Sequence, residues 1–388
     1  MDIVLTRPSP ASPGEFGRRS RSRIDLGLVL STALLIVIGM VSVYAATRNP
    51  LLAQGRSGNA YLVRDLVNLV VGLLLATPLL LIDYRHLRPW APWGYAVVLT
   101  LLVAVLTPLG STVNGAHGWF SIGPVQLEPS EFTKLAVILL LASVLSQRRD
   151  RELAPAWSDI VLALTVAGLP VVLILAEPAL GIALVICVIV AGLLALSDAP
   201  GLWIASLLGG ALLAGTLAFS LHLLKPYQQE RFTYFTNPHA AATSTGYQIE
   251  QSRIAIGSGG LTGQGFLAGS QTEGGFIPEQ QTDFIFTVSA EEGGLLAGTV
   301  LLLAVGLLLW RGITIGSRAP DLYGRLIAGG IVSWFAFQSF VNIGMTLGIM
   351  PVTGLPLPFV SYGGSSLFAN LLGVAFLLNI HRRSSPQG

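Results

Sequence analysis

Long apolar runs separated by short polar connectors make up most of the chain. A helix that crosses a bilayer needs about 20 mostly apolar residues. By that measure the sequence predicts ten membrane-spanning helices, near residues 24–47, 62–83, 89–107, 130–146, 159–176, 179–197, 201–224, 284–310, 322–347 and 365–381. We therefore expect an all-α fold, that of a polytopic membrane protein with a large extracytoplasmic loop before the eighth helix.

Two places in this scheme have an alternative interpretation. The fifth and sixth helices are separated only by AEPALG, in which Pro178 cannot continue a helix. We expect a tight hairpin there, whereas one kinked helix would reduce the count to nine. The first helix could instead be a signal peptide, since VYAAT at 43–47 resembles a cleavage site. Its apolar stretch, Ile24 to Ala46, is longer than the about 7–15 residues of a signal sequence, so we expect an uncleaved helix.

The charged residues support the scheme and orient it. Only 11% of the residues are charged, against about 25% in soluble proteins. With the N-terminus inside, fifteen Arg residues lie in the inner segments and five basic residues in the outer loops: Arg48, Arg56, Lys225, Arg231 and Arg253. The positive-inside rule then places both termini in the cytoplasm. The domains that we expect are a basic tail (1–23), one transmembrane domain (24–383, with the outer loop 225–283) and a C-terminal tail (384–388).

Neither a metal site nor a nucleotide site is indicated. The single cysteine, Cys187, lies within an apolar run, and the five His residues are scattered without an HExxH pattern. The glycine-rich segment GSGGLTGQG, 257–265, lacks the GK[ST] of a phosphate loop and follows no strand. We expect an interfacial helix over QIEQSRIAIGS, 248–258, followed by a glycine-rich turn; a flexible loop is the alternative. The apolar positions that would lie along the membrane surface are Ile249, Ile254 and Ile256.

The large outer loop holds three cations, Lys225, Arg231 and Arg253. Arginines in loops are usually just solvated. Near a membrane, however, the guanidinium fork also fits a pyrophosphate. We therefore name these three residues, with the neighbouring Gln251 and Ser252, as candidates for substrate binding.

Two charged residues fall inside the fourth span. In EPSEFTK, Glu131 and Lys134 are three residues apart and so share one helix face. The pair either neutralises itself in the bilayer or faces a polar cavity, as ionisable residues within spans generally do. The two interpretations are compatible, and we favour the cavity, which makes both residues substrate-binding candidates. Trp119 is another candidate, either an interfacial anchor or a platform for a sugar ring.

Asp283 precedes the apolar run FIFTVSA. A carboxylate there could cap the helix, where it meets a favourable dipole. It could also act as a general base at the mouth of a cavity, and we favour that role. The later segment GIMPVTGLPLPFVSYGGSS, 348–366, has too many prolines and glycines for a regular helix. We expect it to form a re-entrant wall of the cavity.

Four segments, in this order, closely resemble the SEDS family (shape, elongation, division and sporulation): GAHGWFSIGPVQLEPSEFTKLA, GYQIEQSRIAIGSGGLTGQG, FIPEQQTDFIFTVSAEEGGLLAG and GIMPVTGLPLPFVSYGGSS. The resemblance covers nearly all of residues 24–383. The elongation branch, RodA, is nearer than the division branch, FtsW. The resemblance implies a peptidoglycan glycosyltransferase that polymerises lipid II at the outer face of the bacterial cytoplasmic membrane during elongation. The implied partners are a class B penicillin-binding protein (transpeptidase) and other membrane proteins of the elongation complex, with no nucleic acid.

The resemblance also assigns residues. The family's catalytic aspartate corresponds to Asp283, and its PSExxK motif to Glu131 and Lys134. Two positions depart from the family pattern. Gly118 stands where many relatives have Arg before the Trp. Ala179 stands where relatives usually read PDLG, which leaves Glu177 as the one carboxylate that could substitute.

The implied chemistry needs few groups. A sugar that is α-linked to pyrophosphate becomes β-linked in the glycan, so a single inverting displacement with one base suffices. The leaving group needs charge stabilisation rather than an acid. A divalent cation, Mg²⁺ or Mn²⁺, could bridge Asp283 and the pyrophosphate, although no ligand cluster requires one. The rival interpretations are a flippase or other transporter of lipid-linked precursors and an inert scaffold for cell-wall enzymes.

Overall fold

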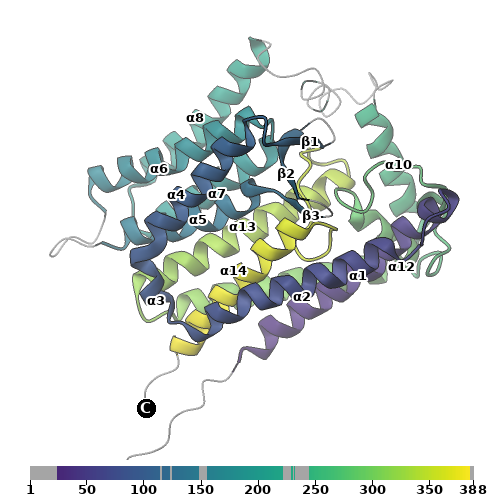
Figure 1. The fold of residues 1–388 in the computed structure, drawn as a ribbon, viewed down its shortest axis with the longest axis horizontal. Helices are drawn as coiled ribbons and strands as arrows, with labels where there is room; N and C mark the ends of the chain where they lie inside the picture. The colour runs from purple at the N-terminus through teal and green to yellow at the C-terminus, as the bar shows by residue number, and fades with distance from the viewer. Residues whose placement is uncertain are drawn as a thin grey trace, which may run out of the picture.

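The computed structural model describes residues 24–113, 116–122, 125–147, 155–221, 229, 231 and 244–384. Long helices form one bundle (Figure 1). The elements are α1 (Leu26–Ala53), α2 (Ala60–Leu81), α3 (Tyr84–Leu87), η1 (Arg88–Trp90), α4 (Ala91–Val105), β1 (Ser111–Val113), β2 (Ala116–Ile122), β3 (Val125–Leu127), α5 (Pro129–Leu145), α6 (Trp157–Ala176), α7 (Leu180–Leu196), α8 (Gly201–Ser220), α10 (Ser244–Ser258), α11 (Ser270–Gly274), α12 (Ile285–Ser317), α13 (Leu322–Thr346) and α14 (Gly364–Ser384).

The helical membrane fold predicted from the sequence is confirmed. Within the described ranges, seven helices are long and apolar enough to cross a membrane: α1, α2, the α3–α4 unit, α6, α12, α13 and α14. Helix α7 is a shorter apolar helix, α8 is apolar over Gly201–Leu217, and α5 occupies the position of the fourth predicted span. Helix α6 ends at Ala176, and α7 begins at Leu180 and packs against α6. The predicted break at Pro178 is therefore present.

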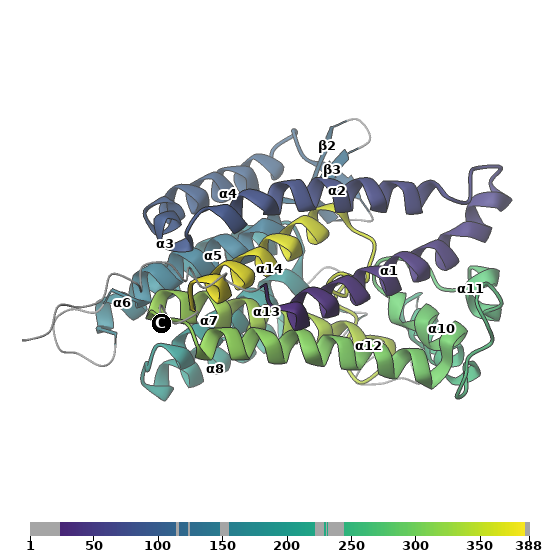
Figure 2. The same cartoon turned by 90° about the horizontal axis from the view of Figure 1, so that it is seen from below.

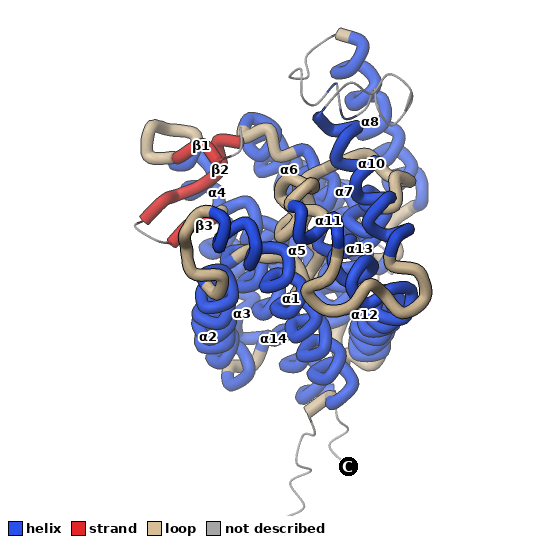
Figure 3. Tube along the Cα trace, turned by 90° about the vertical axis from the view of Figure 1, so that its right-hand side faces the viewer, coloured by secondary structure: helices blue, strands red, loops and turns tan. Residues whose placement is uncertain are grey.

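The two ends of the bundle differ. One end, which we call the sheet end, carries β1–β3, α10 and α11; the other, the tail end, carries α3 and the C-terminal turn of α14 (Figures 1 and 2). The three strands pair antiparallel in the order β1-β2-β3. Figure 3 looks onto the sheet end and shows the sheet to one side, with α10 and α11 to the other. The strands lie in the connector between the predicted spans at 89–107 and 130–146, for which the sequence predicted no strand.

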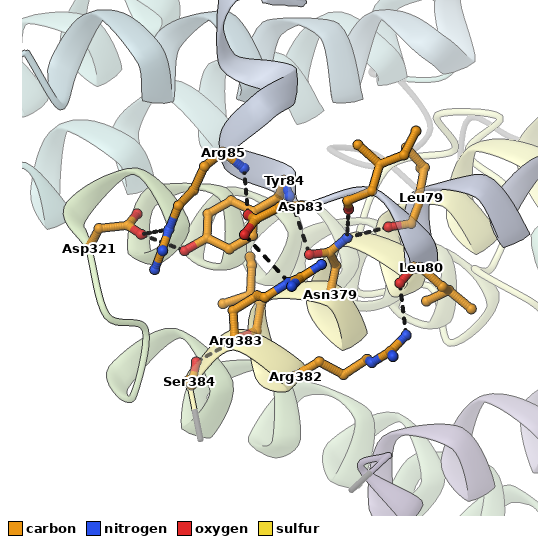
Figure 4. Close-up of polar contacts among 12 residues, drawn as sticks. Leu79, Leu80, Asp83, Tyr84, Arg85, Asp321, Asn379, Arg382, Arg383 and Ser384 are labelled. Atoms are coloured by element: carbon orange, nitrogen blue, oxygen red, sulfur yellow. Dashed lines mark hydrogen bonds and ion pairs between the residues drawn. The ribbon is translucent and has the colours of Figure 1, made fainter. Parts of the chain in front are cut away.

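A polar network fastens the tail end (Figure 4). Asp321, before α13, accepts hydrogen bonds from the Tyr84 hydroxyl at 2.6 Å and the Arg85 Nε at 2.8 Å. From α14, Asn379 donates to the carbonyls of Leu79 and Ile82. These contacts hold the α2–α3 connection against both α13 and α14.

Helix α12 is interrupted near the sheet end. Gly294 has φ 63° and ψ −161°, which breaks the helix. The backbone groups released there pair with the glycine-rich turn, residues 259–265, through Gln264 N–H to Glu291 O (2.9 Å), Gly265 N–H to Glu292 O (3.0 Å), Leu295 N–H to Gly260 O (2.9 Å) and Leu296 N–H to Leu261 O (3.2 Å). The turn predicted in this segment is confirmed. Its glycines allow close approach to α12, since a Cβ on Gly263 would lie 2.0 Å from the Glu292 carbonyl oxygen.

Candidate active site at the sheet end

Asp283 lies in a turn immediately before α12. Its own N–H donates to the Glu279 carbonyl at 3.0 Å, and the Tyr362 N–H donates to the Gln281 carbonyl at 2.9 Å. The N-cap residue of α12 is Phe284, and no side chain caps the helix. The capping interpretation of Asp283 is therefore wrong, and its carboxylate is not used for that purpose.

The Asp283 carboxylate and the Arg231 guanidinium face the same glycine. A Cβ on Gly354 would lie 3.6 Å from Asp283 Oδ2 and 3.7 Å from Arg231 Nη1. Gly354 has φ 71°, a conformation that other residues rarely adopt. The pKa of the half-buried Asp283 is raised to about 6, because burial outweighs the opposing positive charge of Arg231. The charge of Glu279 raises it further, and a hydrogen bond with Thr282 lowers it. Asp283 is thus largely ionised at neutral pH, as a general base must be.

Glu131 and Lys134 form an enclosed ion pair on α5. Lys134 Nζ lies 2.8 Å from Glu131 Oε2, and the two side chains are 0% and 2% exposed. Lys134 also donates to Gln338 Oε1 at 3.1 Å and lies 4.5 Å from the centre of the Trp334 ring. Protein groups rather than an open cavity therefore surround the pair. The role of the two residues in substrate binding stays a prediction.

Two amides one turn apart on α13 hold the irregular segment between α13 and α14. Gln338 Nε2 donates to the Pro356 carbonyl at 2.7 Å, and Asn342 Nδ2 donates to the Leu355 carbonyl at 2.7 Å. The segment forms neither helix nor strand before Gly364 and buries much of its apolar side-chain surface. The irregular backbone expected from its prolines and glycines is thus present, and its role as a re-entrant wall of a cavity stays a prediction.

The candidate residues of α10 have different environments. Ser252 is buried and its hydroxyl donates to the Thr346 carbonyl at 2.7 Å, which ties α10 to α13. Arg253 is exposed, and Gln251 is half-buried. Ile249 packs in a buried cluster with Phe284, so its expected place along the membrane surface is wrong. Lys225 lies outside the described residues, and substrate binding by all these residues stays a prediction.

Trp119 and Glu128 lie on either side of the loop between β2 and β3. Trp119 is half-buried, and its carbonyl accepts a hydrogen bond from the Ser111 hydroxyl at 2.9 Å. Glu128 was missed by the sequence analysis. Its N–H donates to the Ser365 hydroxyl at 2.9 Å, and its carboxylate accepts from the Ser130 hydroxyl at 2.9 Å.

Glu128 is electrostatically linked to the rest of the site. Burial and the charge of Glu131 raise its pKa to about 8. The charges of Lys134 and Asp283 also act on it.

No group of three or more His, Cys, Asp or Glu side chains in the described parts of the chain could hold a metal ion.

Comparisons with known proteins agree over nearly the whole chain. A family model described as "Cell cycle protein" (FtsW, RodA, SpoVE) matches residues 26–386. Stage V sporulation protein E of Bacillus subtilis is 38% identical over 363 residues, covering 93% of this chain and 97% of the relative. The peptidoglycan glycosyltransferase MrdB of Escherichia coli is 37% identical over 356 residues, covering 90% and 92%.

Solved structures show the same fold. A structure described as showing the coordination of polymerization and crosslinking by a peptidoglycan synthase complex contains a similar chain, with a TM-score of 0.78 and 34% identity. The match covers 94% of this chain and 99% of that one. The rod shape determining protein RodA of Thermus thermophilus gives a TM-score of 0.69 at 34% identity, covering 94% and 98%.

Proposed function

Because this chain belongs to the FtsW, RodA and SpoVE (SEDS) family, we infer that it is a peptidoglycan glycosyltransferase embedded in a membrane. We propose further that lipid II is its substrate and that Asp283 is its general base. The observation that carries the proposal is the meeting of the Asp283 carboxylate and the Arg231 guanidinium across Gly354. One group suits proton removal and the other suits a pyrophosphate.

The reaction that we propose is one inverting displacement. Asp283 takes the proton from the attacking hydroxyl, whose oxygen forms a bond to the anomeric carbon of the donor sugar. The bond from that carbon to the lipid pyrophosphate breaks at the same time, and Arg231 stabilises the negative charge of the leaving pyrophosphate. The α-linkage of the donor becomes a β-linkage in the glycan. A divalent cation held by Asp283 would add charge stabilisation at the leaving pyrophosphate, and its participation stays a prediction.

The setting in the cell is also a proposal. The distribution of arginines supports a cytoplasmic tail end, with both termini inside, and a sheet end at the outer face of the cytoplasmic membrane. The likeness to a chain from a synthase complex supports a class B penicillin-binding protein as the crosslinking partner. Sporulation and division relatives are 38% identical and an MrdB relative 37%, so identity does not separate their roles. The assignment to elongation, in company with other elongation proteins, rests on the motif resemblance; rounded rather than filamentous cells after depletion would support it.

The decisive experiment uses purified protein and labelled lipid II in detergent, where no bilayer has to be crossed. We expect long glycan from the wild type and a loss of at least about 100-fold in Asp283→Asn, the scale of general-base catalysis. Glu279→Gln is the matched control, since Glu279 is an exposed carboxylate four residues away. Adding EDTA and then Mg²⁺ or Mn²⁺ tests whether a divalent cation takes part.

Two outcomes would contradict the proposal. Continued polymerisation by a folded Asp283→Asn variant would exclude Asp283 as the base. Absence of glycan from the wild type, even with its penicillin-binding partner, would favour a transporter or a scaffold. The buried Glu131–Lys134 pair within a membrane helix is the feature that would suit a transporter.

A further inference from the structure

Glu177 is a buried carboxylate that no described residue hydrogen-bonds. It lies between α6 and α7 and is 1% exposed. Within the described residues, neither of its carboxylate oxygens has a partner. Buried polar groups are nearly always hydrogen-bonded, and an unpaired buried carboxylate is costly. Glu177 is therefore expected to form hydrogen bonds with a partner other than the described residues of this chain.

The surroundings of Glu177 are acidic and close to the sheet. A Cβ on Gly118, the residue before Trp119, would lie only 3.1 Å from Glu177 Oε2. Glu128 is near enough for its charge to add to the effect of burial, and together they raise the pKa of Glu177 to about 8. Among the described residues, no cation lowers the pKa of Glu177. At neutral pH Glu177 is therefore mostly protonated, and neither it nor Glu128 offers an anionic ligand a positive charge.

Glu177 is linked to the Asp283 site through the irregular segment after α13. A Cβ on Gly181, at the start of α7, would lie 2.9 Å from the Thr353 carbonyl oxygen. Thr353 directly precedes Gly354, which faces Asp283 and Arg231. The Thr353 hydroxyl, like the Glu177 carboxylate, is buried with no partner among the described residues.

Glu128 is a second link between Glu177 and the Asp283 site, because the charge of Asp283 raises the pKa of Glu128. Asp283 thus has a carboxyl group near it, that of Glu128, as well as the Arg231 cation, which faces the same glycine. These charges act differently on the two parts of a lipid-linked sugar, the pyrophosphate and the saccharide. The pyrophosphate is attracted by Arg231, whereas Glu128 and Glu177 supply no positive charge that could bind it.

A saccharide is neutral and rich in hydroxyl and acetamido N–H donors, which carboxylates accept. A protonated carboxyl also donates to a sugar hydroxyl, so either form of Glu177 finds a partner. The half-buried Trp119, next to Gly118, could add the face of an aromatic ring.

We propose that Glu177 and Glu128 form a saccharide subsite that binds the hydroxyl and acetamido groups of the substrate. Glu177 is the buried member of this subsite and Glu128 the half-buried one. This inference rests on the proposed function and deepens it, because it fixes the direction of the substrate. The pyrophosphate lies toward Arg231, and the sugar extends toward the α6–α7 connection.

The test measures the binding of two probes to the purified full-length protein by ligand-observed NMR: N,N′-diacetylchitobiose and inorganic pyrophosphate. Glu177→Ala and Glu128→Ala should weaken binding of the disaccharide about tenfold or more, the scale of a hydrogen bond to a charged group. Both variants should leave pyrophosphate binding within about twofold, whereas Arg231→Ala should weaken pyrophosphate binding only. Glu292→Gln, a buried carboxylate in α12 with one unpartnered oxygen, is the matched control.

Several results would overturn the subsite. These are unchanged disaccharide binding in a folded Glu177→Ala variant, failure of the wild type to bind the disaccharide, or tight Mn²⁺ binding that depends on Glu177. If Glu177→Ala does not fold, disaccharide binding by the Glu128→Ala variant tests the subsite instead, since Glu128 is only half-buried. Glycan synthesis is measured separately. An inactive wild type that still binds the disaccharide through Glu177 would contradict the proposed polymerase and leave the subsite supported.

Discussion

The side-chain amide of Asn342 lies 2.9 Å from the backbone carbonyl oxygen of Asp283 and donates a hydrogen bond to it. The same nitrogen donates to the Leu355 carbonyl at 2.7 Å. One buried residue of α13 therefore joins the turn that carries the proposed base to the irregular segment that faces it. Its neighbour one turn away, Gln338, makes the equivalent connection between Pro356 and Lys134.

Asn342→Ala should slow glycan synthesis without preventing folding. It leaves two buried carbonyls without this donor, which costs about 1–3 kcal/mol each when a group stays unsatisfied. We expect kcat to fall about tenfold or more, because small displacements of a catalytic group are costly. Asn370→Ala, at a buried asparagine of α14, is the matched control. Equal losses of melting temperature and of kcat in both variants would contradict a positioning role for Asn342.

The activity should depend on pH through Asp283. The base acts when deprotonated, and burial raises its pKa to about 6. The kcat/KM of the wild type should therefore rise with pH through about 6 and level off above it. Arg231 lowers this pKa, so Arg231→Ala should move the rising limb to higher pH as well as reduce the rate. Arg56→Ala, an exposed cation at the α1–α2 connection, should leave the limb in place. A limb that stays fixed in Arg231→Ala would show that Asp283 does not control it.

Removing one partner of the Glu131–Lys134 pair should destabilise the protein more than removing both. Lys134→Met leaves the Glu131 charge buried without its partner, which costs about 3–5 kcal/mol. The double variant Glu131→Gln/Lys134→Met should recover most of that loss, as judged by melting in detergent. If the double variant is stable but makes no glycan, the pair has a role in substrate binding. If it is stable and active, that prediction for both residues is wrong.

The break in α12 should not tolerate a side chain. Gly294→Ala places a Cβ 2.3 Å from the backbone nitrogen of Gly263 and adds strain at φ 63°. We expect a loss of stability of at least about 1–2 kcal/mol. Gly306→Ala, in the same helix with no atom within 4 Å of its Cβ position, should be neutral or stabilising by up to about 1 kcal/mol. A Gly294→Ala protein that melts like Gly306→Ala would show that the break is not required.

Local patterns in the sequence were sufficient for several features. The helices follow from apolar runs, because most of these runs are by themselves long enough to cross a bilayer. The contact between Glu131 and Lys134 follows from helical spacing alone and appears at 2.8 Å. The break at Pro178 follows from the missing N–H of proline.

Other features depend on contacts that no local pattern encodes. Asp283 and Arg231 both face Gly354, which lies more than 70 residues after Asp283 in the chain, so no local pattern encodes this arrangement. Asn342 is one amide within a long helix, and its partners are distant in sequence. Ile249 has the spacing of a membrane-surface residue but packs near Phe284, because tertiary contacts decide between two apolar environments. For the break at Gly294, the pair GlyGly within AEEGGLLAG was an available signal.

The glycine-rich turn and the α12 break supply each other's missing backbone hydrogen bonds. Neither segment can therefore change length alone, because a one-residue insertion in either would shift the other out of register. Homologous chains should vary these two stretches jointly, and a chimera that exchanges only one of them should fail to assemble. For protein engineering, the two stretches are one transplantable module, although about 30 residues separate them in the sequence.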